Sequence, residues 1–580
     1  MKNYLLILLF PLSCSKAFSQ FSIKGIVIDN QQEKLQYVKI TSLSTKQIYR
    51  TDVHGEFVIN STTTTDSLKF SYDGYETVIK VLKSTEFNSI ILKSLPSSVF
   101  AKKSHLSSMP LKNKESTSIK PVWNESYKTG TENEFLNTAN ATAISFSANI
   151  NRASYSNVRR FINYMDGPVP PAAVRIEEML NYFNFHFKEP KKDSVFNSTS
   201  FITSCPWNQN NQLLFLNISA RKINTEHLPP NHLVLLIDVS GSMDMPNKLP
   251  LLKTGYRLLI KNLRAIDSVS IITYGEQVTI ITESVSGNEK DSLIKAINSL
   301  TADGPTPGEA GIRMAYKIAK KHFIKEGNNR ILLGADGDFN VGINKEEDLK
   351  KMVEEQKKSG VYLTCLGVGI GNYKDSKLYV LSQIGNGNFA YLDNEQEAEK
   401  VLVSELTQTL FTVADNVFIN VKFNPAYIQS FRLIGYDNDR TSISDTSSLM
   451  EGGEIGSGNS LMAVFEIIPN KDSVVVEANI ATVKINYSLP GQSKLLVSNY
   501  NCKYQFQLFK DAVETVKKAA CVVLFSMKLK ESEFAEKISW KTIKNLCAKN
   551  FTASNFAETE FLDLVNKAQK LYKRKKFFFF

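Results

Sequence analysis

Histidine and cysteine are scarce in this chain of 580 residues, which contains six of each. The histidines, among them His186, His232 and His322, lack the spacing of metal ligands, so each is expected to be structural. No CxxC pair occurs, which argues against structural zinc. The sequence also has no GxSxG elbow, HExxH helix or P-loop. Hydrolases, metalloproteases and nucleoside triphosphatases of those types are therefore not indicated.

Long apolar runs are lacking except at the start, MKNYLLILLFPLSCSKAFSQ. Residues 1–19 have the layout of a signal peptide, with Lys2 before an apolar stretch too short to span a bilayer and a small-x-small sequence at 17–19. The chain is therefore expected to be exported, to the periplasm, the outer membrane or the cell surface. Lipidation of Cys14 remains an alternative and would be the one route to membrane association, although Pro11 stands where a lipoprotein signal favours Leu.

The formal net charge of +11 is spread along the chain rather than gathered on one domain with a nucleic-acid motif, so no nucleic-acid partner is expected. After removal of the signal peptide the number of cysteines is odd and their spacing irregular. Pairing of Cys502 with Cys521 or Cys547 stays open, whereas Cys365 lies in an apolar strand and is expected to be a buried thiol.

Changes in composition and periodicity divide the chain. The order predicted is a signal peptide (1–19), a β-sandwich (20–94), a flexible linker rich in Ser, Lys, Pro, Thr and Asn (95–134), an N-terminal flanking domain (135–228) in which 144–185 is helical, an α/β domain (229–412), a β-rich flanking domain (413–505) and a C-terminal helical region (506–580).

The α/β domain alternates apolar strands such as HLVLLIDVS and VYLTCLGVG with amphipathic helices. This alternation predicts a doubly wound parallel sheet covered by helices on both faces. Ligands of such sheets bind at the carboxyl ends of the strands.

Oxygen-bearing side chains follow three of these strands. They are Asp238, Ser240 and Ser242 in LLIDVSGSMD, Thr306 in LTADGPTPGEAG, and Asp336 in RILLGADGD. Alternate residues of an extended segment point the same way, so the first three can share one ion, and Gly241 is expected to permit a tight turn. An all-oxygen set without His or Cys suits Mg²⁺. The alternative is an ordinary polar turn.

The D-x-S-x-S sequence with the later Thr and A-D-G resembles the metal-ion-dependent adhesion site of von Willebrand factor type A domains. The resemblance implies that Ser240, Ser242 and Thr306 bind Mg²⁺, with Mn²⁺ or Ca²⁺ as substitutes, and that Asp238 and Asp336 act mainly through water. It further implies an open coordination position for a partner's carboxylate. Ala335 departs from the Thr found in many relatives, which affects loop support rather than a ligand.

Two wider resemblances extend beyond that domain. The segments SYSNVRRFINYMDGPVPPAAVRIEEMLNYF, GADGDFNVGI and VKINYSLPG make residues 140–573 similar to bacterial von Willebrand A proteins of the YfbK type. Asn151 and Arg152 stand where relatives often carry Asp and Thr. TDVHGEFVI followed by LKFSYDGYET resembles the carboxypeptidase-regulatory-like domain of exported Bacteroidetes proteins, which has no catalytic residues.

The sequence is compatible with three functions. The first is a non-enzymatic protein that grips an exposed Asp or Glu of another envelope protein through Mg²⁺; Asp244 and Asp338 are near enough in sequence to compete for that position. The second is an enzyme, suggested by GVGIGN at 367–372, which follows the fifth strand and lacks the third glycine of a dinucleotide fingerprint. The third is a structural envelope scaffold whose metal site is unused.

Overall fold

The chain forms two compact units, residues 1–109 and 110–580. A computed structural model describes residues 21–29, 34–35, 38–45, 48–51, 55–61, 63–72, 75–93, 125–128, 130–148, 150–164, 168–185, 187–191, 193–224, 228–304, 308–337, 346–357, 359–370, 373–437, 440–441, 452–470, 476–492, 494–552 and 555–578. The expected signal peptide with Cys14, and residues 95–124 and 129 of the expected linker, lie outside these ranges.

The first unit is a pair of β-sheets around one apolar core. One sheet has the order β4-β1-β7 and the other β3-β2-β5-β6. Alternate residues such as Ile23, Val27, Phe57 and Phe70 point into the core, as expected for strands with one buried face. The predicted N-terminal β-sandwich is therefore confirmed as a fold, while its assignment as carboxypeptidase-regulatory-like stays a prediction. The strands are β1 (Phe21–Asp29), β2 (Lys39–Ser42), β3 (Ile48–Arg50), β4 (Glu56–Ser61), β5 (Thr65–Ser71), β6 (Val78–Lys83) and β7 (Phe87–Leu92).

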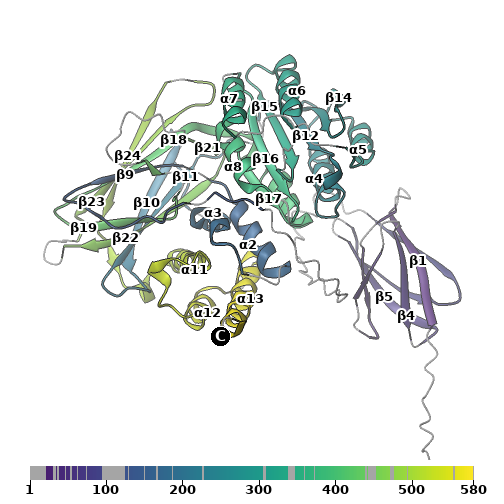
Figure 1. Ribbon diagram of the computed structural model, residues 1–580, viewed down its shortest axis with the longest axis horizontal. Helices are drawn as coiled ribbons and strands as arrows, with labels where there is room; N and C mark the ends of the chain where they lie inside the picture. Colours follow the sequence, from purple (N-terminus) through teal and green to yellow (C-terminus); the bar gives the residue numbers. More distant parts are fainter. Residues whose placement is uncertain are drawn as a thin grey trace, which may run out of the picture. The chain divides into compact units, whose positions relative to one another are not determined.

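The second unit contains the predicted α/β domain, whose sheet has the order β14-β13-β12-β15-β16-β17 (Figure 1). The strands are β12 (Asn231–Asp238), β13 (Ser268–Tyr274), β14 (Val278–Ser286), β15 (Asn328–Ala335), β16 (Tyr362–Val368) and β17 (Phe389–Leu392). The helices are α4 (Leu249–Lys261), α5 (Lys290–Asn298), α6 (Gly308–Lys321), α7 (Glu346–Lys357), α8 (Asp375–Ile384) and α9 (Glu395–Glu399).

Helices cover both faces of this sheet because β12 is apolar on both sides. Val234 and Leu236 pack with residues of α6 and α8 on one face, while Leu235 and Ile237 pack with residues of α4 and α5 on the other. The doubly wound architecture is thus confirmed. One strand departs from the parallel arrangement, since β14 pairs antiparallel with β13 at the edge of the sheet, where a short connection suffices.

A β-body beside the α/β domain consists of two six-stranded sheets. Their orders are β25-β10-β11-β22-β19-β8 and β20-β9-β18-β23-β24, the latter with β21 paired to β18. Its strands come from the chain both before and after the α/β domain, so the two expected flanking regions share sheets. They are β8 (Leu136–Asn137), β9 (Ala143–Ser147), β10 (Phe196–Ser204), β11 (Gln212–Ala220), β18 (Thr412–Phe423), β19 (Ile428–Ile434), β20 (Arg440–Thr441), β21 (Gly453–Gly456), β22 (Ser460–Pro469), β23 (Asn479–Ser488), β24 (Leu496–Lys503) and β25 (Phe506–Gln507).

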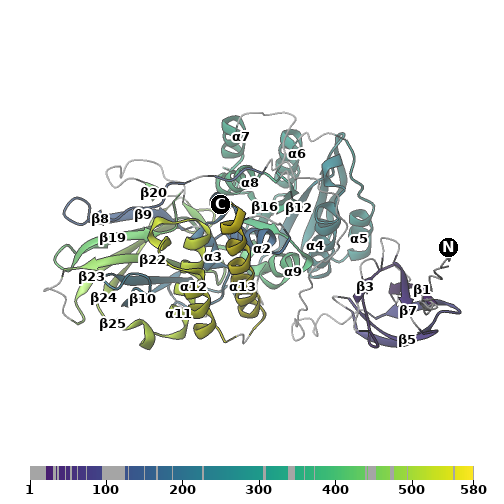
Figure 2. The ribbon, with the colours of Figure 1, turned by 60° about the horizontal axis from the view of Figure 1, so that its bottom comes forward.

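A helical layer covers the first of these sheets (Figure 2). In β11, Leu214 and Leu216 face the core between the sheets, whereas Leu213 and Phe215 face the helices. The layer joins α2 (Ala153–Tyr164) and α3 (Ile176–Asn181), which precede the α/β domain, to α11 (Glu514–Leu529), α12 (Trp540–Asn550) and α13 (Phe556–Phe578), which follow the β-body.

Two expectations about the region before the α/β domain are wrong. Residues 144–147 were expected to be helical but belong to β9, because Ile144 and Phe146 alternate with more exposed neighbours and β9 pairs with β18. The last residues of the expected flexible linker are fixed as well. Ser126 forms a parallel β-bridge with Lys374, and Asn133 Nδ2 donates to the carbonyl groups of Leu433 and Gly435.

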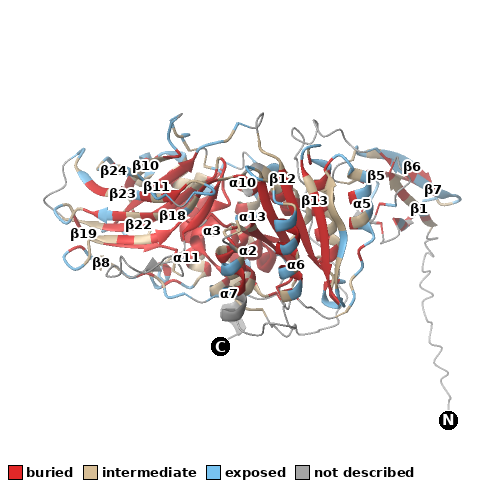
Figure 3. Cartoon of the chain, turned by 90° about the horizontal axis from the view of Figure 1, so that it is seen from above, coloured by how far each residue is buried: buried red, intermediate tan, exposed pale blue. Residues whose placement is uncertain are grey.

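The central strands of the α/β sheet and of the β-body are largely buried, as Figure 3 shows, whereas the edge strands β14 and β24 are more exposed. Within the described ranges, none of the helices combines the length and the apolar character needed to cross a bilayer.

Candidate metal site

Three of the predicted site residues lie together where β12 ends. Asp238 is the last residue of β12, and the backbone amide of Ser240 donates to its Oδ1 over 2.9 Å. A turn of 3₁₀ helix, Gly241–Met243, follows at once and places Ser242 Oγ 3.2 Å from Ser240 Oγ. Asp238 and Ser240 are buried, whereas Ser242 is exposed. The site is therefore closed on its protein side and open at Ser242.

Asp336 joins these residues from the next strand of the sheet. It follows β15, which pairs in parallel with β12, and its Oδ2 accepts a hydrogen bond from Ser242 Oγ over 2.9 Å. Two carboxylates and two hydroxyls thus meet at the carboxyl ends of neighbouring strands, as the sequence predicts. In the described part of the chain, no cluster of three or more His, Cys, Asp or Glu side chains is placed to hold a metal ion. The serine hydroxyls are therefore needed to complete any ion site here.

The second predicted loop follows helix α5 rather than a strand, yet it reaches the first loop two residues before Thr306. The amide of Gly241 donates to the carbonyl of Gly304 over 3.0 Å, and the amide of Asp303 donates to the carbonyl of Val239 over 2.6 Å. Thr306 itself and the rival Asp338 lie outside the described residues. The assignment of Thr306 as a ligand stays a prediction. The other rival, Asp244, is exposed at the end of the 3₁₀ turn.

Gly241 was expected to permit a tight turn, but the turn does not need a backbone conformation that only glycine adopts at that position. Its φ is not positive, and an added Cβ would meet only the Gly304 carbonyl at 3.7 Å. Gly304 carries the constraint instead, because its φ is +78° and a Cβ there would lie 2.5 Å from the amide nitrogen of Glu276. The glycine that the loop geometry requires is therefore in the second loop.

The surroundings of Asp238 disfavour the ionised form of its carboxyl group when no cation is bound. Burial and the nearby charge of Asp336 raise its pKa to about 7, although hydrogen bonds from Ser240 lower it. Asp238 Oδ2 is buried and has no well-formed hydrogen bond among the described residues, although the Tyr274 hydroxyl interacts with the carboxyl group. A buried oxygen of this kind is costly unless a donor or a cation satisfies it.

This arrangement fits a small hard cation. Asp238, Ser240, Ser242 and Asp336 present only oxygen atoms, and Asp238 Oδ2 is under-satisfied in the way that a metal ligand would be. When bound, such an ion would supply a positive charge that attracts an anionic group. The hydrogen bonds already described hold the side chains of Ser240, Ser242 and Asp336 around the place where the ion would bind.

Lys248 is a member of this site that the sequence analysis missed. Its Nζ lies 2.9 Å from Asp336 Oδ2, and its side chain is only 4% exposed. One feature could have pointed to it. Lys248 is the N-cap of α4, where the helix dipole disfavours a positive charge, so a lysine at this position suggests a nearby anionic partner.

The GVGIGN segment does not form an open phosphate cradle in the residues described. A Cβ on Gly367 would lie 2.5 Å from the Tyr373 hydroxyl, and one on Gly369 would lie 2.5 Å from Lys248 Cε. The Gly369 carbonyl accepts from the Tyr391 hydroxyl over 2.6 Å. These two glycines make room for protein side chains, and Gly371 lies outside the described residues.

The other candidate ligands have structural surroundings. His232 and His322 come within 5.5 Å, measured between ring centroids, but His232 Nδ1 pairs with Ser268 Oγ and His322 Nε2 with Glu283. His186 lies outside the described residues.

The five described cysteines are free and buried. Cys502 lies in the core between the two sheets of the β-body, whereas Cys521 and Cys547 lie in the core beneath the helical layer. The structure therefore has neither the Cys502–Cys521 nor the Cys502–Cys547 disulfide.

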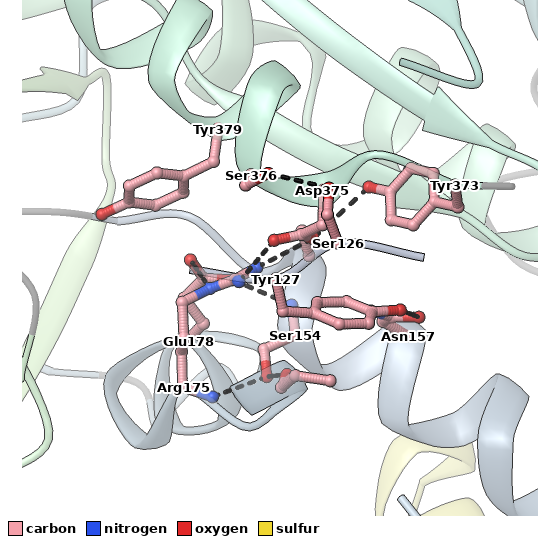
Figure 4. Close-up of polar contacts among 12 residues, drawn as sticks. Ser126, Tyr127, Ser154, Asn157, Arg175, Glu178, Tyr373, Asp375, Ser376 and Tyr379 are labelled. Atoms are coloured by element: carbon pink, nitrogen blue, oxygen red, sulfur yellow. Dashed lines mark hydrogen bonds and ion pairs between the residues drawn. The ribbon is translucent and has the colours of Figure 1, made fainter. Parts of the chain in front are cut away.

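Buried ion pairs hold the α/β domain against the segments that flank it. Figure 4 shows Arg175, just before α3, between Glu178 and Asp375, the first residue of α8. Nearby, Arg159 of α2 contacts Asp393, Glu397 and Glu560. The second of these contacts reaches α9 in the α/β domain and the third reaches α13, so Arg159 links the α/β domain and the C-terminal helix through α2.

Known families match nearly the whole of the second unit. The family model for the von Willebrand factor type A domain matches residues 232–405, and one described as von Willebrand factor matches residues 121–215. A third, "Uncharacterized protein YfbK, C-terminal", matches residues 408–571. These matches follow one another along the chain and together include the α/β domain, the β-body and the helical layer.

Among solved structures, the chain is similar to a von Willebrand factor type A protein from Catenulispora acidiphila. The identity is 12%, the TM-score is 0.38, and the match covers 62% of this chain and 88% of that one. It is also similar to the ArnB paralog VWA2 from Sulfolobus acidocaldarius, with 13% identity, a TM-score of 0.32 and coverage of 65% and 98%. These similarities carry no functional argument.

Two relatives matched by sequence have higher identities to this chain than these solved structures. The chain is 28% identical to sll0103 from Synechocystis over 183 residues, which cover 31% of this chain and 42% of that protein. It is 36% identical to YfbK from Escherichia coli over 446 residues, which cover 72% of this chain and 76% of the relative. The chain therefore belongs to the YfbK family of proteins with a von Willebrand factor type A domain.

Proposed function

We propose that this protein binds a protein partner of the cell envelope through Mg²⁺ held by Asp238, Ser240, Ser242, Thr306 and Asp336, and that the partner supplies an Asp or Glu side chain. The observation that carries the proposal is the under-satisfied oxygen Asp238 Oδ2 beside the two serine hydroxyls and Asp336. An oxygen donor from a partner would complete the coordination that hard cations require. Family membership supports an interaction role rather than catalysis.

Exposure at one side supports the same proposal. Ser242 is exposed while Asp238, Ser240 and Asp336 are buried. A partner's carboxylate would bind in a partly desolvated place, where the attraction between opposite charges is stronger than in an exposed ion pair.

The first experiment measures the melting temperature of the full chain in EDTA and in millimolar Mg²⁺. An ion that binds only the folded state stabilises it by about 1–3 kcal/mol at 10–100 times its Kd. Ser242→Ala should abolish the increase, whereas Ser299→Ala, an exposed serine after α5 in the same domain, should retain it. Equal melting temperatures of the parent protein with and without Mg²⁺ would refute a metal-dependent role.

The second experiment tests the partner. The full chain is used to capture proteins from an envelope extract, with Mg²⁺ and with EDTA. A partner retained only with Mg²⁺ should be lost with Ser242→Ala and with replacement of one of its own acidic residues by the corresponding amide. A partner retained equally in EDTA would place the contact elsewhere on the chain.

A structural scaffold with an unused ion site is the second candidate. The Lys248 ammonium on Asp336 favours it, because this internal cation already neutralises one of the two carboxylates. On this alternative, the melting temperature and the set of captured proteins do not respond to Mg²⁺.

A further inference from the structure

Lys248 brings a fixed positive charge to the candidate metal site. Its Nζ and Ser242 Oγ both contact the same atom, Asp336 Oδ2, each over 2.9 Å. The side chains of Lys248 and Asp336 are 4% and 1% exposed, so water screens this charge little. The lysine is therefore an electrostatic part of the site, although a lysine ammonium cannot itself ligate a metal ion.

The shape of the neighbouring loop keeps the lysine in this position. Gly369, after β16, has a φ of +96°, and a Cβ there would lie 2.5 Å from Lys248 Cε and 3.0 Å from its Cγ. The aliphatic part of the side chain thus packs where only glycine leaves room. The N-terminus of α4 disfavours a cation, and this packing and the contact with Asp336 offset that effect.

Lys248 changes the net formal charge of the ion-loaded site. Asp238 and Asp336 together would neutralise a divalent ion, and the loaded site would then carry no net charge. With Lys248 included, the loaded site carries one net positive charge. A single incoming carboxylate returns the total to zero, which is favourable where the surroundings are partly desolvated.

We propose that Lys248 determines the ligand preference of this site: it weakens divalent-ion binding and makes the ion-loaded site select a carboxylate from the partner. The proposal rests on the proposed function, because it requires that a divalent ion binds. It also assigns a role to the GVGIGN segment, whose Gly369 accommodates the lysine.

The test uses the full chain and Mn²⁺, whose binding is measured by calorimetry and by the relaxation of water protons. Lys248→Met keeps most of the length of the side chain but removes its charge. Mn²⁺ should bind this variant at least about tenfold more tightly, since a like charge close to the ion has been removed. Acetate, titrated into the Mn²⁺-loaded protein, should bind the variant at least about fivefold more weakly than the parent.

The control is Lys253→Met, five residues further along α4, where Nζ donates to the carbonyl groups of Asn298 and Leu300. It should leave both affinities within about twofold of the parent, because Lys253 contacts backbone carbonyls rather than the site. If Lys248→Met does not fold, Lys248→Gln removes the same charge while keeping a hydrogen-bond donor for Asp336.

The outcomes separate the two proposals. If the parent binds Mn²⁺ and the neutral variant binds Mn²⁺ and acetate with the same affinities, the role of Lys248 is refuted and the proposed function stands. If Mn²⁺ binds only the neutral variant, the lysine opposes the ion as inferred, and metal-dependent binding by the natural protein is refuted. If neither protein binds Mn²⁺, both proposals are refuted.

Discussion

Arg175 Nη1 lies 2.7 Å from Asp375 Oδ2, although the two residues are 200 positions apart in the sequence. Both side chains are buried, and Nε of the same guanidinium contacts Glu178 over 2.7 Å (Figure 4). The pair connects the segment before the α/β domain with α8 inside it. Its contribution depends on both partners being present, because an isolated charge at this depth is costly.

Removing the arginine should destabilise the protein strongly. Arg175→Met leaves Asp375 and Glu178 buried without their cation, which typically costs about 3–5 kcal/mol. Urea unfolding of the full chain measures the loss. Arg313→Met is the control, since its i,i+4 pair with Glu309 is half exposed and such pairs contribute about 0–1 kcal/mol. Equal losses in the two variants would contradict the assignment of Arg175 as an interdomain contact.

The two loop glycines should respond differently to the same substitution. Gly304→Ala places a Cβ against the backbone of Glu276 and strains a residue whose φ is +78°, so a loss of about 1–3 kcal/mol is expected. Gly241→Ala meets only ordinary van der Waals contact and should change stability by less than about 1 kcal/mol. Thermal unfolding in EDTA compares them without any contribution from an ion. A larger loss for Gly241→Ala would show that the first loop carries the constraint.

His232 should make the protein sensitive to mild acid. Burial, with a smaller effect from the charge of His322, lowers its pKa to about 4 from an ordinary value of 6.5. Between these values the unfolded chain binds the extra proton, so stability falls as the pH drops below 6.5. The loss at about pH 5 is roughly 1–3 kcal/mol.

The check is the melting temperature of the parent and of His232→Gln at pH 7 and pH 5. The variant should lose less stability over this interval, because its side chain does not titrate. His322→Gln is the control and should keep most of the pH dependence, since burial is the main cause of the His232 shift. The same pH dependence in the parent and in His232→Gln would refute the prediction.

The buried cysteines should be unreactive thiols in the native protein. Burial raises the pKa of Cys205, Cys365 and Cys502, and the thiolate is the form that reacts. An aromatic disulfide reagent should therefore label none of the five described cysteines in the native chain at pH 7. Unfolding without a reductant should expose all five. A lower number after unfolding would indicate a disulfide and contradict the free thiols of the structure.

The sequence was sufficient for features that depend on local periodicity and motif order. The alternation of apolar strands with amphipathic helices predicted the doubly wound domain, and D-x-S-x-S at a strand end predicted the meeting of Asp238, Ser240, Ser242 and Asp336. The features it missed depend on contacts between distant segments. The strand β9 is short, and its pairing with β18 overrides the helical pattern that follows it.

Lys248 was missed for a similar reason. Its neighbours in the sequence form an ordinary turn and helix start, while its partners Asp336 and Gly369 lie about 90 to 120 residues further along the chain. The two flanking regions were also read separately, because the sequence does not reveal which strands share a sheet.

The shared sheets of the β-body impose an order on the making of this protein. β11 ends at Ala220 and its partner β22 begins at Ser460, so the first strand leaves the ribosome long before its neighbour exists. At about 5–20 residues per second the delay is on the order of 10–50 s, far longer than a domain of this kind needs to fold. The α/β domain can therefore fold before the β-body is complete. During that interval β10 and β11 can pair with each other, whereas β22, which pairs with β11, and α11, which packs on the same sheet, are not yet synthesised.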